Sequence, residues 1–315
     1  MTQSLAFVFP GQGSQAVGML AAQAEEHAVV KQTFAEASEV LGYDLWQLCQ
    51  QGPDTDLNRT DRTQPAILTA SVALWRLWCT RTEVRPAFVA GHSLGEYSAL
   101  VAAEVISFAD AVRLVERRGQ LMQQSVPEGQ GGMAAILGLE DQQIIDICAQ
   151  VANGEVVSAV NFNAPGQVVI AGQAAAVQRA VDACKAAGAK RAMPLPVSVP
   201  SHCALMRPAA EELAKDLAAL QWQQPSMTLV QNVSAASPAN LESLRQQLVE
   251  QLYSPVRWVE SIAWIASQGV TDLVECGPGK VLSGLNKRCA KGVATHNIDS
   301  VDGLAAALAA VEQGA

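Results

Sequence analysis

The stretch "AFVAGHSLGEYSAL", residues 87–100, decides the fold of this chain. It begins with the apolar run "AFVA", typical of a buried strand, and continues into a helix-compatible segment. Between them, Gly91-His92-Ser93-Leu94-Gly95 fits the G-x-S-x-G elbow, in which a serine is held on a sharp strand-to-helix turn. Such a turn exposes the hydroxyl at the carboxyl edge of a sheet, where α/β folds bind ligands. Ser93 is therefore a candidate nucleophile, and the alternative is a serine that only caps a helix.

The composition indicates a globular protein of a reducing compartment. Half of the 315 residues are hydrophobic and 16% are charged, which favours a large core over a disordered chain. The seven cysteines form no C-x-x-C pair, so disulfide scaffolds and zinc sites are not expected. The start "LAFVFPGQGSQ" has neither the charged flank nor the long apolar run of a signal peptide or membrane span. We expect a cytoplasmic protein whose net charge of −9 disfavours nucleic acid and anionic membranes as partners.

Buried strands alternate with helices along most of the chain. We expect strands at 4–9, 86–91 and 271–279, a continuous helix over 20–41, and a further helix that begins near Pro65 and runs to Arg81. Strands that are apolar along their whole length and are separated by helices are typical of a parallel sheet covered on both faces. The fold class is therefore α/β, with a central parallel sheet.

The middle of the chain has a different pattern. A strand at 131–139 and a helix at 141–152 precede two strands, a helix and a last strand, which is the β-α-β-β-α-β order of a ferredoxin-like unit. Gly- and Pro-rich segments bound this unit on both sides. We expect a discontinuous large domain of residues 1–126 and 199–315, with residues 127–198 inserted as a ferredoxin-like subdomain.

A serine nucleophile needs a base, and four histidines are available. His27 lies in a Glu-rich helix and is interpreted as a surface residue, whereas His92 is next to Ser93 and points elsewhere on such a turn. His202 follows the inserted unit just before a helix, where catalytic groups of domain-joining loops tend to collect. His296, which has acidic neighbours, remains the second candidate.

Arg118 is an independent indication of the substrate. In the helix "DAVRLVERRGQLMQQ" it stands on the apolar stripe, which consists of Ala111, Leu114, Val115, Leu121 and Met122. A guanidinium in an apolar groove does not deprotonate and therefore needs an anion. One interpretation is a structural ion pair with Asp or Glu, and the other is a clamp for the carboxylate of an acidic substrate.

Seven motifs in order resemble one family, the malonyl-CoA:acyl-carrier-protein transacylases of bacterial fatty-acid synthesis. They cover nearly the whole chain: "FPGQGSQ", "GHSLGEYSAL", "RRGQLMQ", "NFNAPGQVVIAG", "VPSH", "QLYSPVRW" and "ECGPGKVL". The resemblance implies a hydrolase-like α/β domain with a ferredoxin-like insertion, in agreement with the pattern of strands and helices.

The resemblance also implies a role for each matching residue. Ser93 becomes the nucleophile and His202 its base, oriented by a backbone carbonyl at Gln251 rather than by an acid. The backbone amides of Gln12 and Leu94 become the oxyanion hole. These roles agree with the glycine-rich loop at 10–15, whose use we expect to be the placement of N–H groups near the serine turn.

Arg118 then becomes the clamp for a malonyl carboxylate, and Gln64 and Asn163 match positions that line the pocket. The implied reaction carries a malonyl group from malonyl-CoA through a serine ester to the phosphopantetheine thiol of acyl carrier protein, without metal or cofactor. The alternatives are an α/β-hydrolase thioesterase with His296 as base, and a non-catalytic scaffold that docks carrier proteins. We expect a monomer whose carrier docks on a local basic patch, with these candidates: Lys190, Arg191, Lys280, Lys287, Arg288 and Lys291.

Overall fold

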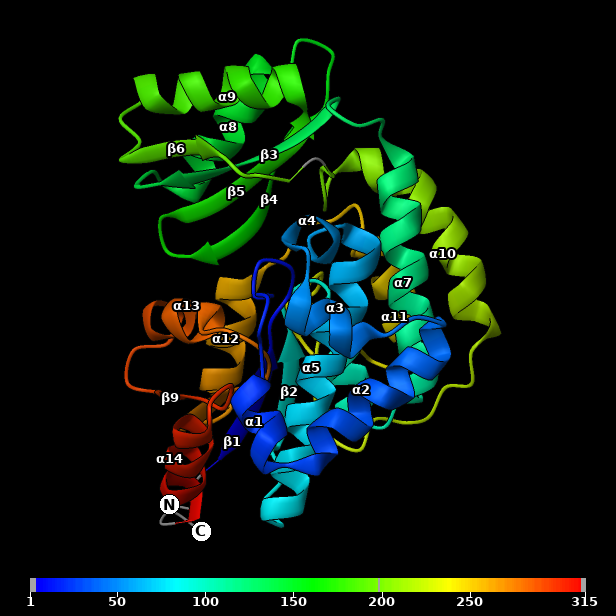
Figure 1. The fold of residues 1–315 in the computed structure, drawn as a ribbon. Helices are drawn as coiled ribbons and strands as arrows, with labels where there is room; N and C mark the ends of the chain where they lie inside the picture. The colour runs from blue at the N-terminus through cyan, green and yellow to red at the C-terminus, as the bar shows by residue number, and fades with distance from the viewer. Residues whose placement is uncertain (1–3, 198, 313–315) are drawn as a thin grey trace.

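A five-stranded parallel sheet forms the centre of the computed structural model, which describes residues 4–197 and 199–312 (Figure 1). The strand order is β7-β2-β1-β8-β9, and every neighbouring pair is parallel. The strands are β1 (Leu5–Phe9), β2 (Phe88–Gly91), β7 (Thr228–Val230), β8 (Asp272–Glu275) and β9 (Ala294–Asn297).

The two faces of the sheet are covered by separate helical layers. The side chains of β1 point alternately to these two layers. Leu5, Phe7 and Phe9 belong to the larger core, whereas the smaller Ala6 and Val8 face the other layer. The second layer consists of α12 (Trp258–Ser267) and α13 (Val281–Cys289). The larger core packs against α1 (Ala21–Glu26), α2 (Ala28–Leu41), α3 (Leu45–Gln51), α4 (Asp54–Leu57), α5 (Thr60–Arg81), α6 (Gly95–Ala102), α7 (Phe108–Ser125), α10 (Arg207–Ala219), α11 (Leu241–Glu250) and α14 (Val301–Glu312).

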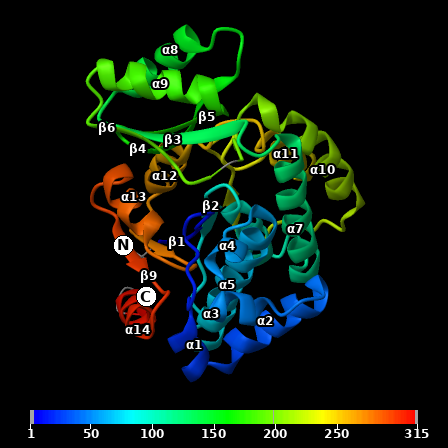
Figure 2. The same cartoon turned by 45° about the horizontal axis from the view of Figure 1, so that its top comes forward.

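A second, antiparallel sheet lies above the first, in the order β4-β5-β3-β6. Figure 2 shows its two helices, α8 and α9, together on the outer face, where they bury a core of their own. This β-α-β-β-α-β arrangement is the ferredoxin-like unit that the sequence predicts. Its elements are β3 (Gly131–Leu137), α8 (Asp141–Val151), β4 (Val157–Ala164), β5 (Gln167–Gln173), α9 (Ala174–Ala186) and β6 (Arg191–Pro194).

The inner face of the second sheet packs onto the larger part of the chain. Met133 and Val169 share a small core with Cys203, which directly precedes the short helix η1 (Ala204–Met206). Backbone hydrogen bonds also join β4 to Val256, since the Val256 N–H donates to the Val160 carbonyl at 2.8 Å. The residues next to His202 are therefore held between the two sheets.

This architecture confirms the predicted α/β class, the central parallel sheet and the ferredoxin-like insertion. The predicted continuous helix over 20–41 is wrong, because extended backbone at His27 (φ −132°, ψ 102°) separates α1 from α2. The predicted helix start at Pro65 is also wrong: α5 begins at Thr60, and Pro65 lies inside it.

Two edge strands, β7 and β9, were not among the predicted strands. Each has only three or four residues and a polar or partly exposed end, so neither has the continuous apolar run that marks a buried strand. Among the described residues, no helix is long and apolar enough to cross a membrane.

Candidate active site

The elbow predicted around Ser93 is present between β2 and α6. Ser93 has φ 52°, a left-handed conformation that costs a non-glycine residue about 1–3 kcal/mol. The flanking glycines permit it, because a Cβ on Gly91 would lie 1.8 Å from the Gly95 carbonyl carbon. The Ser93 hydroxyl bonds a histidine and makes no side-chain cap to α6, which has Leu94 at its N-cap. The helix-cap interpretation of Ser93 is therefore wrong.

His202 is the histidine that meets the serine. Its Nε2 lies 2.7 Å from Ser93 Oγ, and its Nδ1 lies 2.7 Å from the backbone carbonyl of Gln251. A carbonyl only accepts, so Nδ1 carries the ring proton and Nε2 is left to accept the serine proton. The His202 ring is thus oriented by main chain, as the resemblance implies, and within the described residues neither of its ring nitrogens bonds a carboxylate.

The surroundings of His202 keep its ring neutral. The side chain is 2% exposed, and this burial, followed by the positive charge of Arg118, lowers the pKa of His202 to about 3. A neutral imidazole is the form that accepts a proton, so His202 is in the form that a general base requires at all but strongly acidic pH. His202 also has a left-handed backbone, with φ 65°, so both reacting groups sit on strained turns.

Arg118 is fully buried on α7 and is held by two side-chain amides. Its Nη1 donates to Gln64 Oε1 and its Nη2 donates to Gln251 Oε1, both at 2.9 Å. Within the described ranges, no salt bridge joins Arg118 to a carboxylate, and its Nε has no hydrogen-bond partner. Burial lowers the pKa of Arg118, and its neighbours Tyr97 and Glu96 act in the opposite direction. The structural ion pair considered from sequence is not found there, which leaves the anion clamp as the stronger interpretation.

Gln251 links Arg118, the candidate clamp, to Ser93, the candidate nucleophile. While its Oε1 accepts from Arg118, its Nε2 donates to the Ser93 carbonyl at 2.8 Å. One residue therefore contacts the serine, orients the histidine and holds the arginine. This arrangement shows that the three predicted groups share one site.

The loop after β1 lies against the elbow. A Cβ on Gly11 would come within 2.5 Å of the His92 carbonyl oxygen, so the loop and the turn are in direct backbone contact. The backbone N–H groups of Gln12 and Leu94 donate to no atom in the part of the chain that the structure describes. Both N–H groups thus lack an internal acceptor among those residues, as the donors of an oxyanion hole must.

Asn163 lies at the same site but does not bond the clamp. Its Oδ1 bonds His92 Nε2 at 2.7 Å, which attaches β4 of the second sheet to the residue before Ser93. Burial lowers the pKa of His92, so its ring is neutral as well. His92 is a scaffold residue, as predicted, while His27 is half-buried between α1 and α2 rather than on a helix surface.

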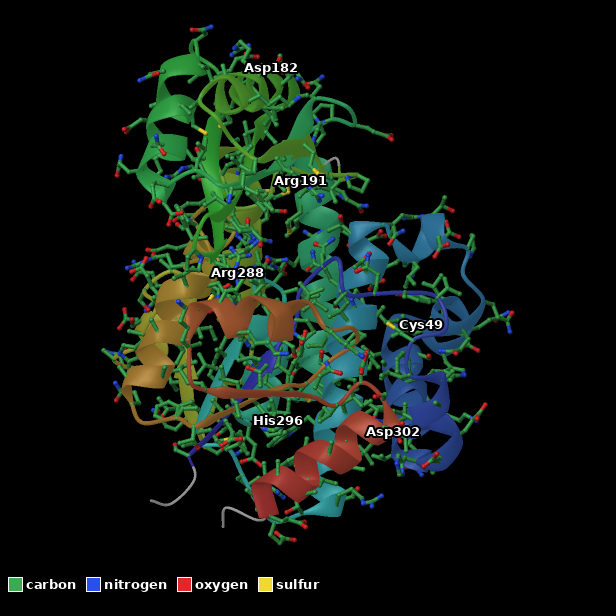
Figure 3. All side chains as sticks on the ribbon, turned by 90° about the vertical axis from the view of Figure 1, so that its left-hand side faces the viewer. Cys49, Asp182, Arg191, Arg288, His296 and Asp302 are labelled. Atoms are coloured by element: carbon green, nitrogen blue, oxygen red, sulfur yellow. The ribbon has the colours of Figure 1, made fainter. Side chains whose placement is uncertain are left out.

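His296, the second candidate base, lies elsewhere. Its Nε2 bonds Asp272 Oδ1 at 2.8 Å, and Asp272 opposes Leu5 at the start of β1. Gly91, at the elbow, opposes Phe9 at the other end of that strand. Figure 3 shows His296 low in the molecule, away from the second sheet. The described residues also contain no group of three or more His, Cys, Asp or Glu side chains that could hold a metal ion.

Sequence reasoning missed two residues of the site, Asn232 and Glu96. The Asn232 side chain accepts from the Ser93 N–H at 2.7 Å and donates to the Gly91 carbonyl at 2.6 Å. These two hydrogen bonds fix the backbone of the serine turn. Glu96 is 1% exposed and accepts from the Asn232 N–H and from Gln251 Nε2. The signal for Asn232 was "LVQN", an apolar run that ends in polar residues at the carboxyl edge of β7.

Comparison with known proteins agrees with this geometry. The family model described as the acyl transferase domain matches residues 6–301, which places the chain in the class of acyl transferases. A malonyl CoA-acyl carrier protein transacylase of Salmonella typhimurium is 60% identical over 308 residues, which are 98% of this chain and 99% of that relative. A Bacillus subtilis protein of the same name is 46% identical over 90% of both chains. The chain belongs to the family of malonyl CoA-acyl carrier protein transacylases.

Solved structures share the whole fold. An acyl carrier protein S-malonyltransferase from Vibrio cholerae is 61% identical with a TM-score of 0.94, covering 97% of this chain and 100% of that one. A malonyl-transacylase solved in complex with a type II PKS acyl-carrier protein is 56% identical with a TM-score of 0.96, covering 98% and 100%.

Proposed function

We propose that this protein transfers a malonyl group from malonyl-CoA to the phosphopantetheine thiol of acyl carrier protein, through an ester on Ser93. The observation that carries the proposal is the bridge by Gln251, which holds the buried Arg118 beside the Ser93–His202 pair. A nucleophile with a neutral base performs acyl transfer, and a buried cation beside it selects an acyl group that ends in a carboxylate.

In the first half-reaction, Ser93 Oγ attacks the thioester carbonyl while His202 Nε2 takes the hydroxyl proton. The N–H groups of Gln12 and Leu94 donate to the oxyanion that forms, and each such donor is worth about 10² to 10³ in rate. The carbon–sulfur bond then breaks, and the coenzyme A sulfur receives the proton from Nε2. The enzyme is left as a malonyl ester.

In the second half-reaction, the carrier thiol gives its proton to His202 as its sulfur attacks the ester carbonyl. The carbon–oxygen bond breaks, and the proton returns to Ser93 Oγ. The same residues thus serve both directions, and every proton and electron pair is accounted for by side chains of the chain itself. For that reason we assign no cofactor to the reaction.

Three broader assignments belong to this proposal. All seven cysteines are free thiols, which is typical of a reducing compartment and supports a cytoplasmic location. One chain supplies the nucleophile, base and clamp, which supports a monomer. The separate core of the second sheet supports an inserted domain at 127–198 within 1–126 and 199–315, although residue 198 itself lies outside the described residues.

The test is the intact mass of the protein after mixing with malonyl-CoA. We expect one malonyl adduct, located on Ser93 by peptide mapping and discharged when acyl carrier protein is added. Free malonate without transfer to the carrier would instead identify a thioesterase. No reaction at all would identify a non-catalytic scaffold.

We place carrier docking on the predicted basic patch near α13, whose six side chains are all exposed: Lys190, Arg191, Lys280, Lys287, Arg288 and Lys291. The Arg288 guanidinium is held in place, because it donates to Gln167 Oε1 at 2.7 Å and to the Pro165 carbonyl. Figure 3 shows it where the second sheet meets the rest of the chain, with Arg191 above it.

Reversing Lys287 and Lys291 to glutamate should raise the KM for the acidic carrier and flatten its salt dependence, with kcat for malonyl-CoA unchanged. An exposed ion pair is worth up to about 1 kcal/mol, or about fivefold in binding. The control matched in charge to either single reversal is Lys31→Glu on α2, which is also exposed and lies in the other helical layer. Equal effects at both places would show that only net charge matters and would remove the patch.

A further inference from the structure

Glu96 is a buried carboxylate that none of the roles above uses. It lies on the first turn of α6, three residues after the nucleophile, with 1% of its surface exposed. Its Oε1 accepts from the backbone N–H of Asn232 at 2.7 Å, and its Oε2 accepts from Nε2 of Gln251. Both oxygens therefore face N–H donors.

These two partners are the residues that hold the reacting groups. Asn232 fixes the Ser93 N–H with its side chain. Gln251 fixes His202 through its carbonyl and Arg118 through its Oε1. Glu96 thus hydrogen-bonds one residue that positions Ser93, which is Asn232, and one that positions His202 and Arg118, which is Gln251. Among the described residues it makes no hydrogen bond to Ser93, His202 or Arg118 itself.

We propose that ionised Glu96 is the positioning residue of this site, a single acceptor that holds the Ser93 arm through Asn232 and the His202 and Arg118 arm through Gln251. The role resembles that of the acid in a catalytic triad. The difference is that Glu96 acts through Gln251 and does not bond the His202 imidazole itself. The substrate named in this inference is that of the proposed function, whereas the positioning role of Glu96 rests only on the contacts described above.

The charge state of Glu96 matters because its neighbours are donors. A protonated carboxyl carries an O–H on one oxygen and loses the negative charge, so that oxygen becomes a weaker acceptor and one of the two arms would be held less firmly. The charged and titratable groups around it are Arg118 on α7 and Tyr97 on α6, with His202 beyond Gln251. Burial raises the pKa of Glu96 to about 8, against the Asn232 and Gln251 donors and Arg118, which lower it.

The rate of acyl transfer should therefore rise with pH as Glu96 ionises and completes the arrangement. The neutral form of His202 is already populated over this range, since its pKa is about 3. A tenfold change in the ionised fraction of one carboxyl takes about one pH unit below its pKa. We expect acylation to increase by about three- to tenfold between pH 7 and pH 9.

The experiment compares the wild type with Glu96→Gln and Glu96→Asp in single-turnover acylation from pH 5 to pH 9.5. In Glu96→Gln the amide can satisfy only one of the two donors, so kcat should fall by about 10- to 100-fold, as for a misplaced reacting group, and the pH step should vanish. Its KM for malonyl-CoA should change by less than about threefold, because Arg118 keeps its charge and Gln64. Glu96→Asp keeps the charge and should retain the pH step at an intermediate rate.

Glu275→Gln is the matched control. Glu275 is also buried, and it accepts from the N–H groups of Leu282 and Ser283 at the start of α13. This variant should lower the melting temperature and leave the rate of serine acylation and its pH profile unchanged. A pH step that persists in Glu96→Gln, or no step in the wild type, would overturn the proposal.

A second substrate separates this inference from the proposed function. An activated ester, p-nitrophenyl acetate, acylates a serine through the nucleophile and base and has no carboxylate for the clamp. If it reports the Glu96-dependent step while malonyl-CoA forms no adduct, the proposed substrate is wrong and the positioning role stands. If malonyl-CoA acylates the wild type and Glu96→Gln with the same rate and pH profile, the positioning role alone is wrong.

Discussion

His202→Ala should lower the rate of Ser93 acylation by about 10²- to 10⁴-fold, the usual contribution of a general base. The loss follows from the contact between Nε2 and Ser93 Oγ at 2.7 Å, since the described residues offer the hydroxyl no other histidine. The binding of malonyl-CoA should be nearly unchanged, because Arg118 is held by Gln64 and Gln251 and not by the imidazole. Stopped-flow acylation separates the two effects.

His296→Ala is the control for this result. It removes a half-buried histidine paired with Asp272 at the opposite end of the sheet, so it should affect stability and leave acylation intact. The reverse outcome, an active His202→Ala and an inactive His296→Ala, would support the hydrolase arrangement considered from sequence.

Arg118→Ala should remove the preference for malonyl over acetyl groups. Removing one partner of a buried charged contact costs about 2–5 kcal/mol, so kcat/KM for malonyl-CoA should fall about 30-fold or more. Acetyl-CoA has no acyl carboxylate, so kcat/KM for acetyl-CoA should fall little. The Ser93–His202 contact does not involve the guanidinium. The measurement is kcat/KM for both thioesters.

Arg117→Ala is the control, because Arg117 is adjacent, partly exposed and 3.5 Å from Asp216. It removes the same side chain from the outer face of the same helix and should leave the selectivity unchanged. If Arg118→Ala kept the wild-type ratio of malonyl to acetyl transfer, Arg118 would not be the clamp.

The residues that could be predicted from sequence are those whose local pattern is unusual. Ser93 stands between two glycines at the end of an apolar run, and Arg118 stands on an apolar helix stripe. Each pattern places a polar or strained residue where it destabilises the fold unless a specific contact compensates. In the structure Ser93 contacts His202 and Arg118 contacts Gln64. The strands β1 and β2 were visible for a related reason, since a strand buried on both faces is apolar along its whole length, whereas β8 was visible only through its apolar centre, Leu273 and Val274.

The rest depended on contacts between distant segments. Asn232 lies 139 residues from Ser93, whose N–H it accepts, and it follows a three-residue strand that no periodicity reveals. Residue type alone also could not decide which of His202 and His296 is the better candidate for the base. It depends on which end of the sheet each reaches, and only the register of β8 and β9 settles that.

The acceptor that orients His202 belongs to the main chain of Gln251, and every amino acid carries the same carbonyl. In a triad, one substitution deletes the acid; here no single substitution at position 251 deletes the carbonyl that accepts the hydrogen bond from Nδ1–H. The orientation of the base is therefore tolerant of changes in side-chain chemistry and sensitive to the path of the backbone that follows α11. Over evolutionary time, insertions and deletions in that turn should be rejected more strictly than replacements of the residue itself.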